Sequence, residues 1–121
     1  YIGNTNIIDA AVLWERNSYI FNTYMCVSFQ FQKHLSLGRG GIILLDSQDA
    51  YNSLVKMVYD GRDSSKRWAE QDISTIGYHY YMTPETAQMG LHKLEECKDI
   101  PPRKWDQNDY PYLPTMSVFK K

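Results

Sequence analysis

The chain has 121 residues, a formal net charge of −1 at pH 7, 43% hydrophobic residues and 14% aromatic residues. This length and composition predict one folded domain and exclude a disordered chain. The net charge is close to zero, whereas a protein that binds nucleic acid or an anionic membrane surface usually has an excess of basic residues.

The chain carries no signal for a membrane, a secretory route or a metal. Its apolar runs are far shorter than the ~20 residues of a membrane span, and its start does not resemble a signal peptide. We therefore expect a soluble, cytoplasmic protein. Cys26 and Cys97 are interpreted as buried or half-buried thiols, not as a disulfide. The three histidines and two cysteines show no metal-ligand spacing, so we assign no metal.

Three apolar segments predict sheet strands near residues 6–10, 24–29 and 41–45. The first ends in Asp9 and two alanines, which suits the carboxyl end of a buried parallel strand, where ligands collect in α/β sheets. The third is continuously apolar, as expected of a strand that is covered on both faces. These segments predict an α/β fold.

A single lysine, Lys33, lies between the second and third predicted strands. A turn containing Gly38, Gly40 and Gly41 follows it and leads into the third strand. Taken alone, such a turn lets strands bend, and the lysine is most simply a surface residue. Arg39, within the turn, is likewise interpreted as a surface arginine.

A first helix is predicted after the third strand. Asp46 or Ser47 is its expected N-cap, and Gly61 ends it. Its apolar residues recur at helical spacing, which indicates a scaffold helix with a core-facing stripe; they are Ala50, Leu54, Met57 and Val58. The charged loop that follows, from Asp60 to Asp72, is expected to be solvated.

A second helix is predicted to begin at Pro84, with Thr83 as its N-cap, because a proline at the first helical position leaves no N–H unpaired. Gly90 within it permits the close approach of a neighbouring element. From residue 100 onward, four prolines alternate with aromatic residues. They predict an extended tail over residues 100–121 whose aromatic side chains pack on the body, which occupies residues 1–99.

Three blocks, in this order, resemble the DegT/StrS-type sugar aminotransferases, which are pyridoxal-phosphate enzymes of fold type I. Ile8–Ala11 resembles that family's Glu-Asp-Ala-Ala motif. Ser28–Gly41 resembles its cofactor-lysine segment, Ser-Phe-His-x-x-Lys followed by Gly-Glu-Gly-Gly, with Gln30 and Arg39 departing from it. Gly77–Leu94 resembles its Gly-Tyr-Asn-Tyr-Arg-Met motif and the helix that follows. The resemblance covers roughly residues 7–94.

The resemblance implies that residues 1–99 are part of the large pyridoxal-phosphate-binding domain. Lys33 would hold pyridoxal 5'-phosphate as a Schiff base and then move a proton between the amino donor and the cofactor. Asp9 would pair with the pyridine nitrogen, and Ser28 would donate to the phosphate. His79 occupies the position of an asparagine that reaches the phosphate of the neighbouring subunit, which implies a homodimer.

The implied function is the transfer of an amino group, with glutamate as donor, to a nucleotide-linked keto-sugar for the synthesis of polysaccharides or glycosylated metabolites. A chain of 121 residues that starts at Tyr1 is short for such an enzyme, so we expect a fragment or a processed chain. The spacing from Asp9 to Lys33 is also short by the resemblance, which predicts a trimmed hairpin between Trp14 and Tyr24.

Two alternatives remain open at this point. A truncated or degenerate relative could act as a non-catalytic binding or assembly module, which is favoured by the departures from the family pattern at Val12, His79 and Tyr81. An unrelated small α/β binding domain is the other alternative, because motif matches have a high false-positive rate.

Overall fold

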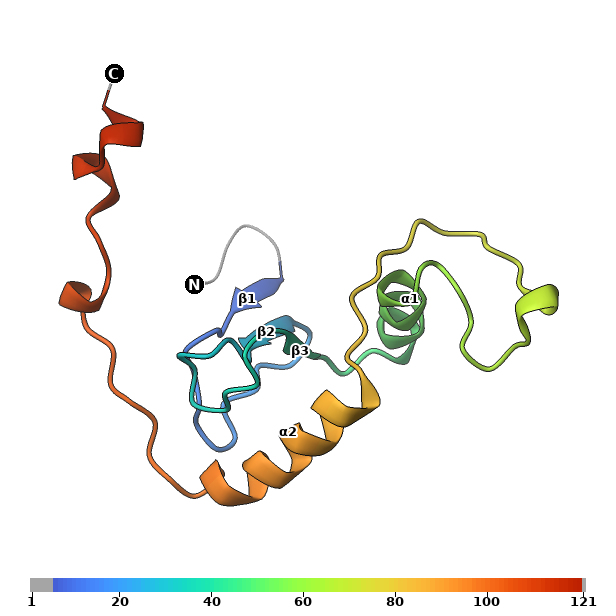
Figure 1. The fold of residues 1–121 in the computed structure, drawn as a ribbon, viewed down its shortest axis with the longest axis horizontal. Coiled ribbons are helices and arrows are strands. Elements are labelled where there is room, and N and C mark those ends of the chain that lie inside the picture. The colour runs from blue at the N-terminus through green and yellow to red at the C-terminus, as the bar shows by residue number, and fades with distance from the viewer. Residues whose placement is uncertain (1–5, 121) are drawn as a thin grey trace.

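The computed structural model describes residues 6–120, which form a mixed α/β structure around a small three-stranded sheet (Figure 1). The strands are β1 (Ile7–Asp9), β2 (Tyr24–Ser28) and β3 (Gly41–Leu44), and the α-helices are α1 (Gln48–Val58) and α2 (Pro84–Cys97). Short 3-10 turns are η1 (Trp68–Glu70), η2 (Gln107–Asp109), η3 (Leu113–Thr115) and η4 (Ser117–Phe119). The three predicted strands and both predicted helices are therefore confirmed.

The strand order is β1-β2-β3, with β1 parallel and β3 antiparallel to β2. Ile8 of β1 lies opposite Met25 of β2, and both side chains are buried together with Ala10. These apolar side chains form the first of two small hydrophobic cores. The sheet confirms that the first strand is parallel to its neighbour and ends in Asp9, but the expected burial holds only for Ile8, since Ile7 and Asp9 are exposed.

The predicted hairpin between Trp14 and Tyr24 is wrong. Because β1 and β2 are parallel, the chain must return to the starting end of the sheet before β2 begins. It does so in an irregular loop in which Asn17 and Asn22 adopt left-handed φ angles of 62° and 61°. The Asn22 N–H donates to Oδ2 of Asp46 at 2.9 Å, which fastens this loop beside the start of α1.

The prediction that the third strand is covered on both faces is also wrong. The strand residues Ile42 and Ile43 keep 46% and 41% of their surface exposed. Among the described elements, α1 lies to one side of the sheet and not over β3 (Figure 1). The continuous apolar pattern correctly indicated a strand, but it did not indicate whether other elements pack over its two faces.

Helix α1 is capped by Ser47, one of the two expected N-caps, whose Oγ accepts a hydrogen bond from the Ala50 N–H at 3.2 Å. Gly61 takes a left-handed φ of 77° just beyond it, as expected of a glycine that ends a helix. The apolar stripe, however, is not core. No residue of α1 is buried, and Met57 is 38% exposed.

The segment of residues 78–80 runs back to α1 and forms backbone hydrogen bonds with its C-terminal end. The Tyr78 N–H donates to the Met57 carbonyl at 2.6 Å, and the Tyr80 N–H donates to the Val58 carbonyl at 3.0 Å. This pairing brings the backbone of Gly77 against that of Gly61, so closely that neither position has room for a Cβ atom. The two glycines therefore close the long loop of residues 61–77.

Helix α2 starts as predicted, with Thr83 Oγ1 accepting from the Thr86 N–H at 3.3 Å and Pro84 at the first position. Gly90 is buried against the Leu37 side chain, which confirms the expected close approach. Leu37, Leu35 and Phe29 form the second small core. Helix α2 thus packs on the loop that contains Lys33.

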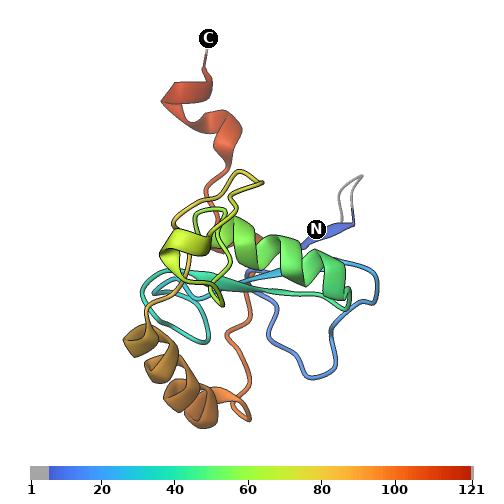
Figure 2. The same ribbon diagram turned by 90° about the vertical axis from the view of Figure 1, so that its right-hand side faces the viewer.

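The tail is extended, as predicted, apart from its short 3-10 turns, but most of its aromatic side chains do not pack on the body. Tyr110, Tyr112 and Phe119 are exposed, and only Trp105 of the tail's aromatic residues is half-buried. Figure 2 shows the last turns standing clear of the sheet and of both helices. The tail therefore meets the body near Trp105.

Within residues 6–120, no helix combines the length and the apolar composition that crossing a membrane would require.

Candidate functional site

A cavity of about 130 Å³ lies where β1 and β2 end. Its wall has three parts: the segment that follows β1, the end of β2 with the Lys33 loop, and the start of the tail. The lining residues are Ala11–Trp14, Val27, Ser28, Gln32–Leu35, Pro102, Arg103 and Trp105. The carboxyl ends of adjacent parallel strands are where α/β sheets bind ligands.

Lys33 lies in a turn that local hydrogen bonds hold in place. Its N–H donates to the Gln30 carbonyl at 2.8 Å, and the Gln32 N–H donates to Gln30 Oε1 at 2.9 Å. Beyond the turn, Leu35 is buried in the second core, and Lys93 of α2 donates to the Ser36 carbonyl at 2.8 Å. A well-anchored loop therefore places Lys33 in the cavity wall.

Ser28, the last residue of β2, lines the same cavity as Lys33. Its Oγ accepts a hydrogen bond from the Gln30 N–H at 3.2 Å. This bond uses an oxygen lone pair, so the O–H group keeps its capacity to donate. The structure thus brings together two of the four predicted site residues.

Asp9 lies at the same edge of the sheet but outside the cavity lining. It is opposite Cys26 in the parallel register, and alternation along β2 places Ser28 on the same face as Cys26. Asp9 and Ser28 therefore share one face of the sheet. The Asp9 carboxylate accepts a hydrogen bond from the Ala11 N–H at 3.0 Å.

His79 lies beside α1 and does not line the cavity. Its Nδ1 is 3.3 Å from Asp60 Oδ2, and its ring centroid is 4.4 Å from that of Tyr81. The side chain is 72% exposed. Within one chain, the structure separates His79 from Lys33 and Ser28.

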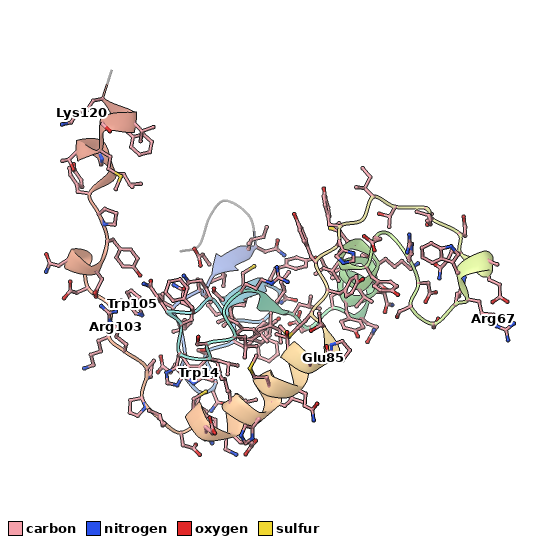
Figure 3. The ribbon with its side chains drawn as sticks, in the orientation of Figure 1. Trp14, Arg67, Glu85, Arg103, Trp105 and Lys120 are labelled. Carbon is pink, nitrogen blue, oxygen red and sulfur yellow. The ribbon has the colours of Figure 1, made fainter. Side chains whose placement is uncertain are left out.

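Sequence reasoning missed the aromatic and cationic groups that the tail adds to the cavity. The Lys33 Nζ lies 5.1 Å from the centroid of the Trp105 ring, and the Arg103 guanidinium lies 4.3 Å from it. Figure 3 shows Trp105 and Arg103 together where the tail passes the sheet, with Trp14 on the same side. The sequence Arg103-Lys104-Trp105 suggests a cation–π contact within the tail. It does not show that Trp105 also reaches Lys33, because that contact depends on the path of the tail.

The cavity has a cationic wall. Lys33 and Arg103 line it, and its lining includes no aspartate or glutamate. Arg103 also forms an ion pair with the half-buried Asp109, which is not part of the lining. A wall of this kind favours an anionic ligand.

One further wall residue, His34, connects the cavity to α2. Its Nε2 lies 2.9 Å from the Cys97 carbonyl, and its ring packs on Trp14 with centroids 5.0 Å apart.

Burial raises the pKa of the Cys97 thiol, which favours the uncharged form. Cys97 is therefore a packing residue and not an activated nucleophile, in agreement with the sequence interpretation.

Comparison with known proteins identifies a family and a relative that this chain resembles. Residues 15–110 match the model of the DegT/DnrJ/EryC1/StrS aminotransferase family. An uncharacterized protein of Methanocaldococcus jannaschii, MJ1066, is 27% identical over 84 residues, which covers 64% of this chain and 22% of that relative. The chain therefore spans about a fifth of the relative's length. The matched range includes Ser28, Lys33, His79 and Trp105 and begins after Asp9.

Proposed function

Because this chain belongs to the DegT/DnrJ/EryC1/StrS aminotransferase family, we propose that it serves the transfer of an amino group from glutamate to a nucleotide-linked keto-sugar. The family consists of enzymes that depend on pyridoxal phosphate. We further propose that its α/β body is part of the large domain of a fold-type I enzyme. In this proposal the large-domain part is residues 1–99 and the tail follows it, although the family match continues to residue 110.

The observation that supports this proposal most strongly is that Lys33 and Ser28 line one cavity beyond the carboxyl ends of β1 and β2. Ser28 precedes Lys33 by five positions, and the Gln30 hydrogen bonds turn the chain so that both reach the same wall. A primary amine and a hydroxyl donor in the wall of one cavity suit a ligand that carries an aldehyde and a phosphate.

The residues fit pyridoxal phosphate at these two ends. Lys33 can bond to the aldehyde carbon through Nζ, and the Ser28 O–H can donate to a phosphate oxygen. Asp9, at the end of the adjacent strand on the same face as Ser28, is the acid that we propose for the pyridine nitrogen. When bound, the cofactor supplies an electron sink for the bonds at the donor's α-carbon.

The roles of the chain's own groups follow from this placement. The amine of Lys33 would accept the proton from the donor's α-carbon and deliver it to the carbon that receives the amino group. The Ser28 hydroxyl fixes the phosphate end, so the reacting atoms stay within reach of Nζ. The Asp9 carboxylate would keep the ring nitrogen protonated.

Transfer of the amino group can be tested without knowing the sugar. The full chain, treated with pyridoxal phosphate and freed of excess, is expected to release about one equivalent of 2-oxoglutarate per bound cofactor when L-glutamate is added. Lys33→Ala should release less by about 10²-fold or more in initial rate, because the proton acceptor is lost. Lys66→Ala, in an exposed loop, is the matched control. Equal release by Lys33→Ala and the unchanged chain would contradict the proposal.

We also propose that His79 acts in the site of a second copy of the chain. Its separation from the Lys33 cavity and its 72% exposure support a role outside its own subunit. Sedimentation at working concentration is expected to show a dimer, and His79→Ala should weaken cofactor retention. A monomer that retains full glutamate-dependent release would exclude this role.

A second candidate function is a non-catalytic binding or assembly module of the same family. The observation that favours it is the cavity volume of about 130 Å³, which is below the roughly 300–1,000 Å³ of typical ligand pockets. This candidate predicts that the chain binds pyridoxal phosphate weakly or not at all. The same glutamate assay separates the two functions.

A further inference from the structure

The C-terminal tail lines the candidate site with Pro102, Arg103 and Trp105, and of these Trp105 also contacts the Lys33 side chain. Trp105 is half-buried, whereas its neighbours Lys104 and Asp106 are exposed. Its indole lies 5.1 Å from Lys33 Nζ and forms part of the cavity wall. The tail therefore makes a specific contact with Lys33, and it leaves the body again beyond this point (Figures 1 and 3).

The contact is a cation–π interaction between two segments far apart in the sequence. An ammonium group within about 6 Å of an indole centroid is attracted to the ring's negative face. Arg103 also lies over the ring of Trp105, at 4.3 Å. By contrast, the similar Arg62–Trp68 contact, at 3.5 Å, joins residues of one exposed loop and lies outside the cavity.

We propose that Trp105 is a positioning residue for Lys33, which it holds across the cavity while no carbonyl group is bonded to Nζ. The inference deepens the proposed function, on which it rests for the role of Lys33. The contact depends on the charge of the ammonium, and Nζ attacks a carbonyl carbon only as the neutral amine, so the contact is given up before that bond forms. The tail is thereby part of the site, and its position responds to the state of Lys33.

The reactivity of each lysine with a small aldehyde tests this inference directly. Brief treatment of the full chain with formaldehyde and a mild borane methylates each amine: nitrogen attacks the carbonyl carbon, water leaves, and the borane delivers hydride to that carbon. Peptide mass spectrometry then gives the rate for Lys33 relative to Lys56, an exposed lysine of α1.

Trp105→Ala is expected to speed methylation of Lys33, relative to Lys56, by about two- to fivefold, because the amine no longer has to leave the indole. Trp105→Phe should give a smaller increase, since a phenyl ring holds a cation less strongly. Trp68→Ala removes the comparable indole of the outer loop and should leave the Lys33 rate unchanged.

An unchanged or lower Lys33 rate in Trp105→Ala would overturn the inference, as would an equal increase in Trp68→Ala. Far-UV circular dichroism of the variants checks that the helices are retained. The methylation result decides this inference whichever way the glutamate assay turns out, because formaldehyde needs neither cofactor nor substrate. Failure of the proposed function is seen separately, as absent release of 2-oxoglutarate.

Discussion

Lys33→Ala is expected to give no visible absorbance band on addition of pyridoxal phosphate, whereas the unchanged chain should give one. The band reports a covalent bond between the cofactor's aldehyde carbon and an amine held in a protein site. Lys33 is the lysine that lines the cavity, whose wall also includes Ser28. Its loop is fixed by the buried Leu35 and Leu37, so loss of the amine should not disturb the fold.

A titration followed by absorbance measures this effect. Lys93→Ala is a demanding control, because Lys93 donates to the Ser36 carbonyl and supports the same loop without lining the cavity. It should raise the half-saturating cofactor concentration by no more than about tenfold, or about 1.4 kcal/mol, because the lost hydrogen bond supports the loop and lies outside the cavity wall. A full band in Lys33→Ala would show that another amine reacts.

Gly77→Ala is expected to destabilise the chain by about 2–3 kcal/mol, because a new methyl group has no room between two backbones. A Cβ at this position would lie 1.7 Å from the Gly61 nitrogen and 2.1 Å from the Asp60 carbonyl carbon. Backbone atoms cannot rotate away as a side chain can. The pairing of Tyr78 and Tyr80 with the end of α1 should therefore open.

Urea unfolding gives the change in stability, and amide hydrogen exchange at Tyr78 and Tyr80 shows where it acts. Gly90→Ala is the matched control, since its Cβ would meet only the tip of the Leu37 side chain, at 3.0 Å. The gain in helix propensity offsets part of that contact, so a change within about 1 kcal/mol is expected. Equal stability of Gly77→Ala and the unchanged chain would show that the two glycines do not close the loop.

The elements that could be predicted from the sequence are those set by neighbouring residues. Ser47 and Thr83 cap helices through hydrogen bonds that span three residues, and the apolar run from Tyr24 needs no distant partner to favour a strand. Gly61 ends α1 because it takes a left-handed φ, which is a property of that residue itself.

What could not be predicted depends on partners distant in sequence. The apolar run of β3 indicates a strand but not whether anything covers Ile43, and the stripe of α1 likewise shows no partner for Met57. The direction of β1 relative to β2 determines that the intervening loop is not a hairpin. Each of these features follows from the arrangement of elements and not from local propensity.

In the candidate site, too, the features set by neighbouring residues could be predicted and those set by distant residues could not. The spacing of Ser28 and Lys33 placed both in one cavity wall, because a short turn joins them. Asp9 reaches the same sheet edge, but its role at the ring nitrogen stays a prediction. The role of His79 also stays a prediction, since it requires a second chain. Trp105 was not identified, because only the path of the tail brings it to Lys33.

The central claim, that Lys33 is the amine that bonds pyridoxal phosphate, is tested most directly by locating the adduct. The full chain is incubated with one equivalent of the cofactor, reduced with borohydride, digested and mapped by mass spectrometry. Most of the phosphopyridoxyl group is expected on Lys33. A group spread over exposed lysines such as Lys56 and Lys66, with no preference for Lys33, would contradict it.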